Sequence, residues 1–206
     1  MSIDSYNGTG VVAMRGKDCV VIASDKRFGI EHFAVSSSMH KTFRINEKCL
    51  LALSGLPTDV QTVKQETDYN VGLYELRQGV TMSPDTLSGL ISGLLYQKRF
   101  GPWYVSPVIA GISNDGAPFL DSMDCIGSRH EEKTIPFVVA GTCSDQLYGM
   151  CESLYRPDLP ADELFEVVSQ CLLSAVDRDP ISGWGAEAFI MTKNSLVRKD
   201  LKTRQD

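Results

Sequence analysis

The sequence has few histidines, no closely paired cysteines and no long apolar run. Only His32, His40 and His130 are present, so a histidine-based catalytic triad has few candidates, and each of the three is typical of a surface residue. The six cysteines include no C-x-x-C pair, and they are therefore predicted to be reduced thiols in the core. No run approaches the roughly 20 apolar residues that a membrane span needs. We expect no membrane partner, no metal and no cofactor.

The sequence also lacks a basic excess and a targeting signal. Its 26 acidic and 20 basic residues give a net charge of -6, which would repel nucleic acid, and no cluster of Lys, Arg and aromatic residues offsets it. Residues 1–8 have neither the basic start nor the apolar centre of a secretory signal. We therefore expect no nucleic-acid partner and a location in the cytoplasm and nucleus.

Short apolar runs and amphipathic segments alternate in groups along the chain. Ser83 and Pro84 are typical of a helix start, Thr58–Gln61 has the pattern of a capping box, and Gly79 is typical of a helix end. Further along, the residues Leu164, Val168, Cys171, Leu172 and Ala175 recur at helical spacing. The predicted strands are 10–14, 19–23, 34–35, 42–45, 49–55, 105–110, 118–123, 136–140, 186–192 and 196–201, and the predicted helices are 58–77, 83–95, 144–155 and 160–176.

The order of these elements predicts the fold class. Grouped strands and grouped helices disfavour a parallel doubly wound sheet and favour antiparallel sheets packed beneath helical layers. Strands such as 49–55 are too continuously apolar to have a wet face. We therefore predict an α+β, four-layer αββα sandwich, with two packed antiparallel sheets flanked by helices, in a single domain over residues 1–206.

Several polar residues and one glycine lie at the ends of these predicted elements. Asp25 closes the second strand, Lys41 precedes another, and Gly55 ends the strand over 49–55. Asp179 and Ser182 follow the last long helix. Each of these residues taken alone is typical of a cap, a turn or a solvated charge.

Together with Thr9, these residues resemble the pattern of proteasome beta subunits, which are N-terminal-nucleophile hydrolases. Asp25 lies sixteen positions after Thr9, and Lys41 lies sixteen positions after Asp25. The resemblance implies that the threonine is the nucleophile of active members and that the lysine, held by the aspartate, tunes its proton chemistry. It also implies an oxyanion donor at the amide of Gly55, while Asp179 and Ser182 order the terminal amine.

The chemistry of such a nucleophile sets a condition. A threonine hydroxyl needs a nearby base, and a free α-amine with a pKa of about 7.7 to 8.0 is suitable near neutral pH, whereas a peptide nitrogen is not. The Gly8-Thr9 bond must therefore be hydrolysed before Thr9 becomes a catalyst.

Other segments resemble the type-3 group of eukaryotic beta subunits. They are Tyr6-Asn7-Gly8, Lys98–Pro102, Tyr148–Tyr155, Asp177-Arg178-Asp179 and Arg204-Gln205-Asp206. This resemblance implies that residues 1–8 are a short retained leader and that the subunit is non-catalytic. The sequence departs from the group because Thr9, preceded by Gly8, stands where type-3 members usually have glycine. Gly10 follows it, where active subunits continue with a second threonine or an isoleucine.

Two functions follow. The first is a structural subunit of the beta ring of the 20S core particle, which serves ATP- and ubiquitin-dependent protein degradation, with Thr9, Asp25, Lys41, Gly55, Asp179 and Ser182 as a vestigial constellation. Its implied partners are other beta subunits, with type-2 and type-4 as neighbours, the alpha-ring subunits and the opposite beta ring. The alternative is an active threonine endopeptidase, formed after cleavage between Gly8 and Thr9.

Five further residues fall where active subunits shape the pocket for a substrate side chain. A place in the core is an equally good interpretation of each, and no substrate specificity follows from them. They are Phe28, Met39, Phe43, Leu53 and Pro57.

Overall fold

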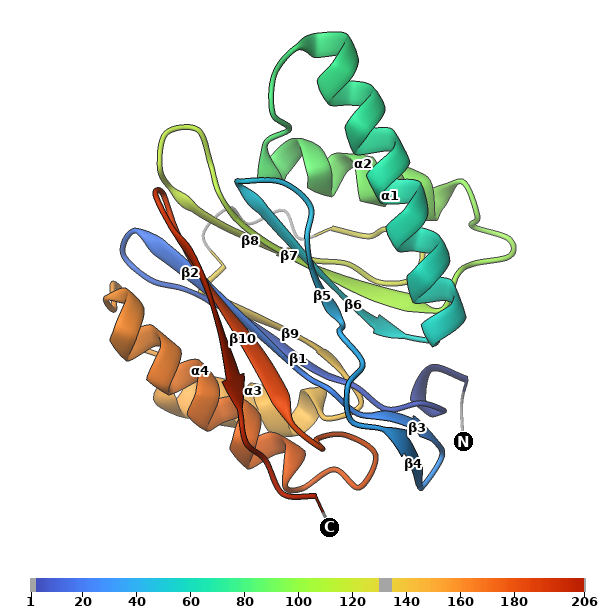
Figure 1. The fold of residues 1–206 in the computed structure, drawn as a ribbon, viewed down its shortest axis with the longest axis vertical. Coiled ribbons are helices and arrows are strands. Elements are labelled where there is room, and N and C mark those ends of the chain that lie inside the picture. Colours follow the sequence, from blue (N-terminus) through green and yellow to red (C-terminus); the bar gives the residue numbers. More distant parts are fainter. Residues whose placement is uncertain (1–2, 130–134, 206) are drawn as a thin grey trace.

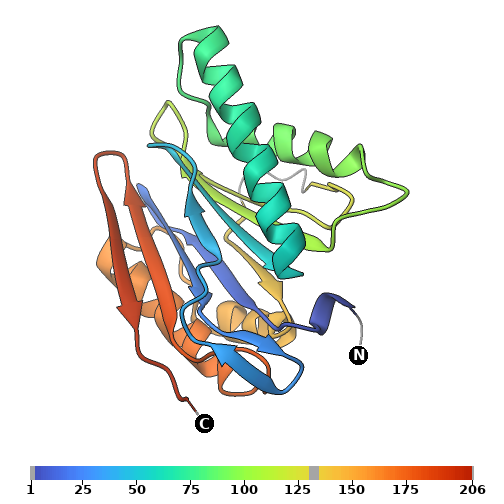
Figure 2. The ribbon, with the colours of Figure 1, turned by 45° about the vertical axis from the view of Figure 1, so that its right-hand side comes forward.

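Two antiparallel sheets packed face to face form the middle of the molecule, and helices cover the outer face of each (Figures 1 and 2). The structure is a computed structural model that describes residues 3–129 and 135–205. His130 and Asp206 lie outside these ranges. Within them, four α-helices and two large sheets appear in the predicted order, and the α+β, four-layer arrangement is confirmed.

The first sheet has five strands in the order β11-β10-β2-β1-β9. Neighbouring strands are antiparallel throughout, with Val12 opposite Ala23 in one pair and Val139 in the next. Helices α3 and α4 cover its outer face, so β2 is buried along its whole length. The elements are β1 Gly10–Arg15, β2 Cys19–Asp25, β9 Phe137–Gly141, β10 Ala186–Thr192, β11 Leu196–Leu201, α3 Ser144–Leu154 and α4 Ala161–Val176.

The second sheet has four strands in the order β5-β6-β7-β8, and α1 and α2 cover its outer face. A separate two-stranded hairpin, β3 and β4, lies beside the N-terminal segment. The elements are β5 Thr42–Arg44, β6 Cys49–Gly55, β7 Val105–Ile112, β8 Pro118–Ser122, α1 Pro57–Gln78, α2 Pro84–Tyr96, β3 Phe28–Ile30, β4 Phe33–Ser36 and the 3₁₀ turn η1 Ile3–Ser5.

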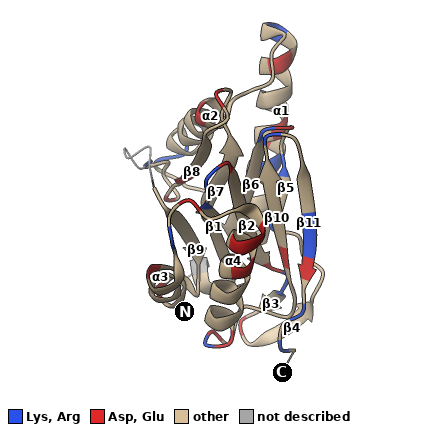
Figure 3. Cartoon of the chain, turned by 90° about the vertical axis from the view of Figure 1, so that its left-hand side faces the viewer, with Lys and Arg blue, Asp and Glu red and all other residues tan. Residues whose placement is uncertain are grey.

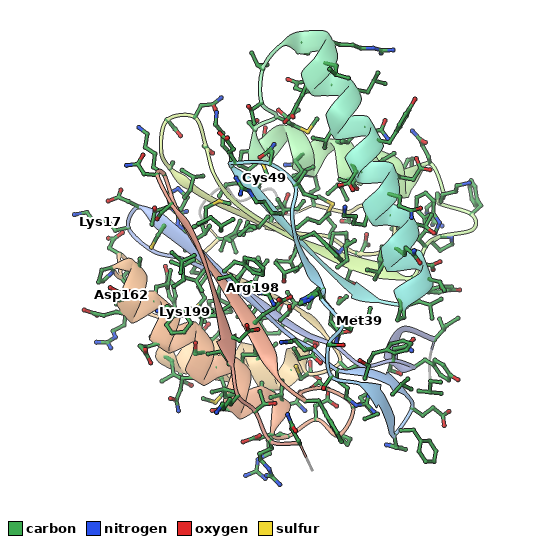
Figure 4. All side chains as sticks on the ribbon, in the orientation of Figure 1. Lys17, Met39, Cys49, Asp162, Arg198 and Lys199 are labelled. Atoms are coloured by element: carbon green, nitrogen blue, oxygen red, sulfur yellow. The ribbon has the colours of Figure 1, made fainter. Side chains whose placement is uncertain are left out.

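Three apolar layers hold the four structural layers together. The predicted face of α4, including Val168 and Leu172, is buried against the five-stranded sheet. Small side chains such as Val11 and Ala13 fill the space between the sheets. Cys49, labelled at the start of β6 in Figure 4, belongs to the third layer, beneath α1 and α2. Burial at about 25 cal/mol per Å² of apolar surface makes these layers the main source of stability.

The helix ends confirm two sequence predictions and correct a third. The Ser83 hydroxyl accepts a hydrogen bond from the amide of Thr86, and Gly79 ends α1 with a φ of 68°. The predicted capping box at Thr58 is wrong, because α1 already begins at Pro57 and Leu56 holds the cap position. The β3 strand and the turn over Ile3–Ser5 were not predicted.

Charged side chains lie on the outer surface in complementary groups. Figure 3 shows acidic residues on α4 and basic residues on β11. The Lys199 ammonium lies 4.1 Å from the ring centroid of Phe165, so the two elements are in contact at that point. No helix among residues 3–129 and 135–205 is long and apolar enough to cross a membrane.

Candidate hydrolase site at Thr9

Thr9 lies immediately before β1 and is almost fully buried. Its amide donates to the Thr142 hydroxyl at 3.2 Å, and its carbonyl accepts from the Thr142 amide at 2.7 Å. Its own hydroxyl donates to the carbonyl of Gly8 at 2.6 Å. Thr9 is therefore fixed on both sides by the chain around it.

Asp25 and Lys41 form a buried ion pair beside Thr9. The Lys41 Nζ lies 2.6 Å from Asp25 Oδ1, and the two side chains are 2% and 0% exposed. Asp25 also accepts the backbone amides of Gly10, Arg27 and Gly183 at 2.9, 3.3 and 3.1 Å. Since a buried charge is costly without partners, these bonds make the carboxylate tolerable in the interior.

The Lys41 ammonium also contacts the peptide that precedes Thr9. Its Nζ donates to the Gly8 carbonyl at 3.2 Å, the same oxygen that accepts the Thr9 hydroxyl. Two donors thus converge on the carbonyl of the bond that would have to be cut.

Asp179 and Ser182 lie in the loop after α4. Asp179 Oδ2 accepts the Thr142 hydroxyl at 2.6 Å, and its other oxygen accepts the amide of Ile181 at 3.2 Å. Asp179 therefore reaches Thr9 through the hydroxyl of Thr142. Ser182 is buried in the same loop, near the thiol of Cys143.

Gly55 is the last residue of β6 in the four-stranded sheet, and it faces Thr9 across a cavity. The two residues line one cavity of about 230 Å³, to which Ser5 of the leader also contributes. Gly55 has a φ of 121°, and a Cβ there would lie 2.1 Å from the carbonyl oxygen of Tyr104. The backbone itself therefore requires glycine here.

The structure brings all six predicted site residues to one end of the two sheets. They are Thr9, Asp25, Lys41, Gly55, Asp179 and Ser182. The sequence analysis missed Arg27, which lies two residues after Asp25 and is only 1% exposed. Burial lowers the pKa of its guanidinium, while the nearby carboxylates of Asp25 and Asp179 oppose that change.

A second hollow adjoins the β3–β4 hairpin. It is a groove of about 540 Å³, and four of the five residues that suggested a side-chain pocket line it, namely Phe28, Met39, Phe43 and Pro57. Figure 4 labels Met39 in the segment that leads into β5. Leu53 is instead a buried core residue.

Cysteine thiols and possible metal ligands are the remaining groups to consider near the site. All six cysteines are free, and five are buried. Burial raises the pKa of Cys143 to about 12, and the charges of Asp25 and Asp179 act in the same direction. No group of three His, Cys, Asp or Glu residues suited to a metal occurs in the part of the chain that is described.

The four-layer fold, with an end-of-strand cluster around a threonine, is the arrangement of a proteasome subunit. A profile of the proteasome subunit family matches residues 5–191, and the chain belongs to this family. It therefore assembles with other proteasome subunits.

The chain is similar over its whole length to beta type-3 subunits. It is 47% identical over 206 residues to "Proteasome subunit beta type-3" of Picea mariana and 48% identical over 207 residues to that of Drosophila melanogaster. It is 46% identical over 209 residues to "Probable proteasome subunit beta type-3" of Schizosaccharomyces pombe. Each alignment covers 100% of both chains, and the resemblance found in the sequence is confirmed.

Proposed function

We propose that this chain is a non-catalytic subunit of the beta ring of the 20S core particle, in which Thr9 stays within an uncut chain. The observation that supports the proposal is the way the residues before Thr9 are held in the interior: Asn7 is 7% exposed, and the Gly8 carbonyl accepts a hydrogen bond from the Lys41 ammonium at 3.2 Å. While the Gly8-Thr9 bond is intact, the Thr9 nitrogen is a peptide N–H and cannot take up the hydroxyl proton. The hydroxyl itself is turned toward the Gly8 carbonyl.

In this role the Asp25-Lys41 pair is structural. Asp25 ties the starts of β1 and of the 183–186 segment to the end of β2 through backbone amides, and Lys41 neutralises it. Removing one partner of a buried pair leaves an uncompensated charge, so the pair can be retained without any catalytic use.

The finer assignment of partners is part of the same proposal. The similarity to beta type-3 subunits supports type-2 and type-4 beta subunits as neighbours, contacts with the alpha ring and the opposite beta ring, and a location in the cytoplasm and nucleus. Several large apolar side chains are exposed on the chain, notably Phe33 at 80%, Leu76 at 86% and Phe100 at 99%. Burial of such side chains against neighbours favours a ring over a free chain.

The alternative function is a threonine endopeptidase that forms after cleavage between Gly8 and Thr9. The proximity of Thr9, Asp25 and Lys41 favours it, because these are the side chains that the resemblance assigns to active members, and cleavage would add the α-amine.

Intact-mass measurement of the chain taken from assembled particles separates the two functions. A mass that includes residues 1–8 is expected. A mass that corresponds to a chain beginning at Thr9 would contradict the non-catalytic proposal. As a second test, an electrophile that forms a ring with both a hydroxyl and a free α-amine should label the active subunits of the same particle and leave this chain unlabelled.

A further inference from the structure

One buried arginine, Arg27, joins the leader segment before Thr9 to two other segments of the chain. We propose that Arg27 is a positioning residue that clamps residues 6–8 in place and thereby holds the Gly8-Thr9 peptide against Lys41. We call Asn7, Arg27, Gly29, Glu31 and Ile181 the leader clamp. The inference rests on the proposed function in one respect, because it requires the leader to be uncut.

The guanidinium of Arg27 joins three separate segments. Its Nη1 donates to the carbonyls of Asn7 and Ile181 at 3.1 and 2.9 Å, and its Nη2 donates to the carbonyl of Glu31 at 2.9 Å. A planar group with several fixed donors can span three carbonyls in this way, whereas a lysine ammonium acts as a single point. Leader, hairpin and the loop after α4 therefore meet at one side chain.

The leader adds its own bonds to the hairpin. The amide of Glu31 donates to the carbonyl of Tyr6 at 2.8 Å, and the Asn7 side-chain amide donates to the carbonyl of Gly29 at 2.8 Å. Figures 1 and 2 show the N-terminal segment beside β3 and β4. The leader is thus held to the hairpin by backbone and side-chain bonds.

Two glycines provide the space for these contacts. A Cβ at Gly29 would lie 2.1 Å from Arg27 Nη1. A Cβ at Gly8 would lie 1.7 Å from the Ile181 carbonyl oxygen, and the φ of Gly8 is +71°. Because Gly8 adopts this left-handed conformation in direct contact with Ile181, the leader passes close enough to deliver the Asn7 carbonyl to Arg27.

The clamp also connects the leader to the site. Ile181, which accepts from Arg27, donates its amide to Asp179, and Asp179 accepts the Thr142 hydroxyl that contacts Thr9. Loss of the leader would remove the Asn7 acceptor from a buried cation, which is unfavourable unless water or the loop rearranges. The leader is therefore positioned by the same loop that carries Asp179.

Hydrogen exchange on assembled particles tests the clamp. Two variants are compared with the wild type. Arg27→Lys keeps the positive charge but loses the planar guanidinium with its several donors, and Gly29→Ala keeps the arginine but fills the space of its guanidinium. In both, exchange in peptides covering residues 3–9 and 28–36 is expected to become faster by about tenfold or more, because the bonds lost are local. Peptide 164–175 of α4 should exchange as in the wild type.

Arg44→Lys is the matched control, because Arg44 is exposed and its guanidinium makes one hydrogen bond within the described residues, to the carbonyl of Asn46 at 3.3 Å. It should leave the leader unchanged. Unchanged exchange of the leader in both test variants would overturn the clamp. Faster exchange that includes residues 164–175 would also overturn it, since Arg27 would then act on stability in general. The intact mass of the wild-type chain tests the proposed function separately. If the chain is uncut but neither variant changes the exchange of residues 3–9, the clamp is refuted and the proposed function is not.

Discussion

The ammonium of Lys41 lies 2.6 Å from Asp25 in the interior, and it bonds at the same time to the carbonyl of Gly8. One cation thus links the carboxylate at the end of β2 to the peptide in front of Thr9. In the proposed function, this contact holds the peptide before Thr9 in place.

Substitution of this pair should be costly, and unequally so. Lys41→Ala is expected to destabilise the subunit by about 3 to 5 kcal/mol, because it leaves a buried carboxylate without its cation. Asp25→Ala should cost more, since three backbone amides lose their acceptor as well. The measurement is incorporation into particles and their thermal unfolding. Normal incorporation of Lys41→Ala together with loss of one peptidase activity would contradict the structural role.

Lys26→Ala is the matched control for these variants. Lys26 pairs with Asp200 at 3.0 Å on the surface, where the aspartate is 62% exposed. Solvent-exposed pairs contribute about 1 kcal/mol or less, so this variant should assemble as the wild type does.

The Thr9→Ala variant should keep every peptidase activity of the particle. It removes one hydrogen bond, from the hydroxyl to the Gly8 carbonyl, and a change of about 1 kcal/mol in unfolding free energy is expected. Peptidase assays with substrates for each active subunit provide the check. Selective loss of one activity would show that Thr9 is a nucleophile after all.

Gly55→Ala is expected to destabilise the chain whether or not Gly55 ever donates to an oxyanion. The positive φ alone should lower the free energy of unfolding by about 1 to 3 kcal/mol. The close approach of the Tyr104 carbonyl should add to this loss. Gly72→Ala is the control: Gly72 lies in α1 with no atom within 4 Å of a built Cβ, so alanine should stabilise by about 0.5 to 1 kcal/mol. Thermal unfolding of the two particles should therefore shift in opposite directions.

Stability should fall at alkaline pH partly through Cys143. The pKa of its thiol is raised from 9.0 to about 12, so the folded chain keeps the proton that the unfolded chain loses. The contribution is complete below pH 9.0 and is lost progressively as the pH rises toward 12. Cys143→Ala should flatten the decline in unfolding free energy over this window. A Cys125→Ala variant, changed at a half-buried cysteine, should retain the wild-type slope.

The sequence predicted most of the fold because the long elements have strong local signals. The buried strands β6 and β10 match their predicted ranges, and the apolar face of α4 is buried as expected. The short strand β3 was missed since three residues carry no periodicity. The capping box at Thr58 failed because the helix begins one residue earlier, at Pro57, whose fixed φ suits the first helical position.

Only those site residues could be predicted whose spacing in the sequence resembles that of the family. That spacing identified Thr9, Asp25 and Lys41. In the structure Thr9 and Lys41 both donate to the Gly8 carbonyl, and Asp25 accepts from Lys41. Arg27 was not predictable, because its partners are backbone carbonyls, two of them from segments distant in sequence, and every residue type has a carbonyl. Its burial alone distinguishes it from an ordinary surface arginine.

The formal charges around the Gly8-Thr9 bond cancel. Asp25 and Asp179 are balanced by Lys41 and Arg27, and the peptide between them is neutral. Hydrolysis would add an α-amine to a site that already holds two cations and two carboxylates. In the proposed role, one covalent bond, positioned by Arg27, keeps the site inactive, while the charged residues around Thr9 are already in place.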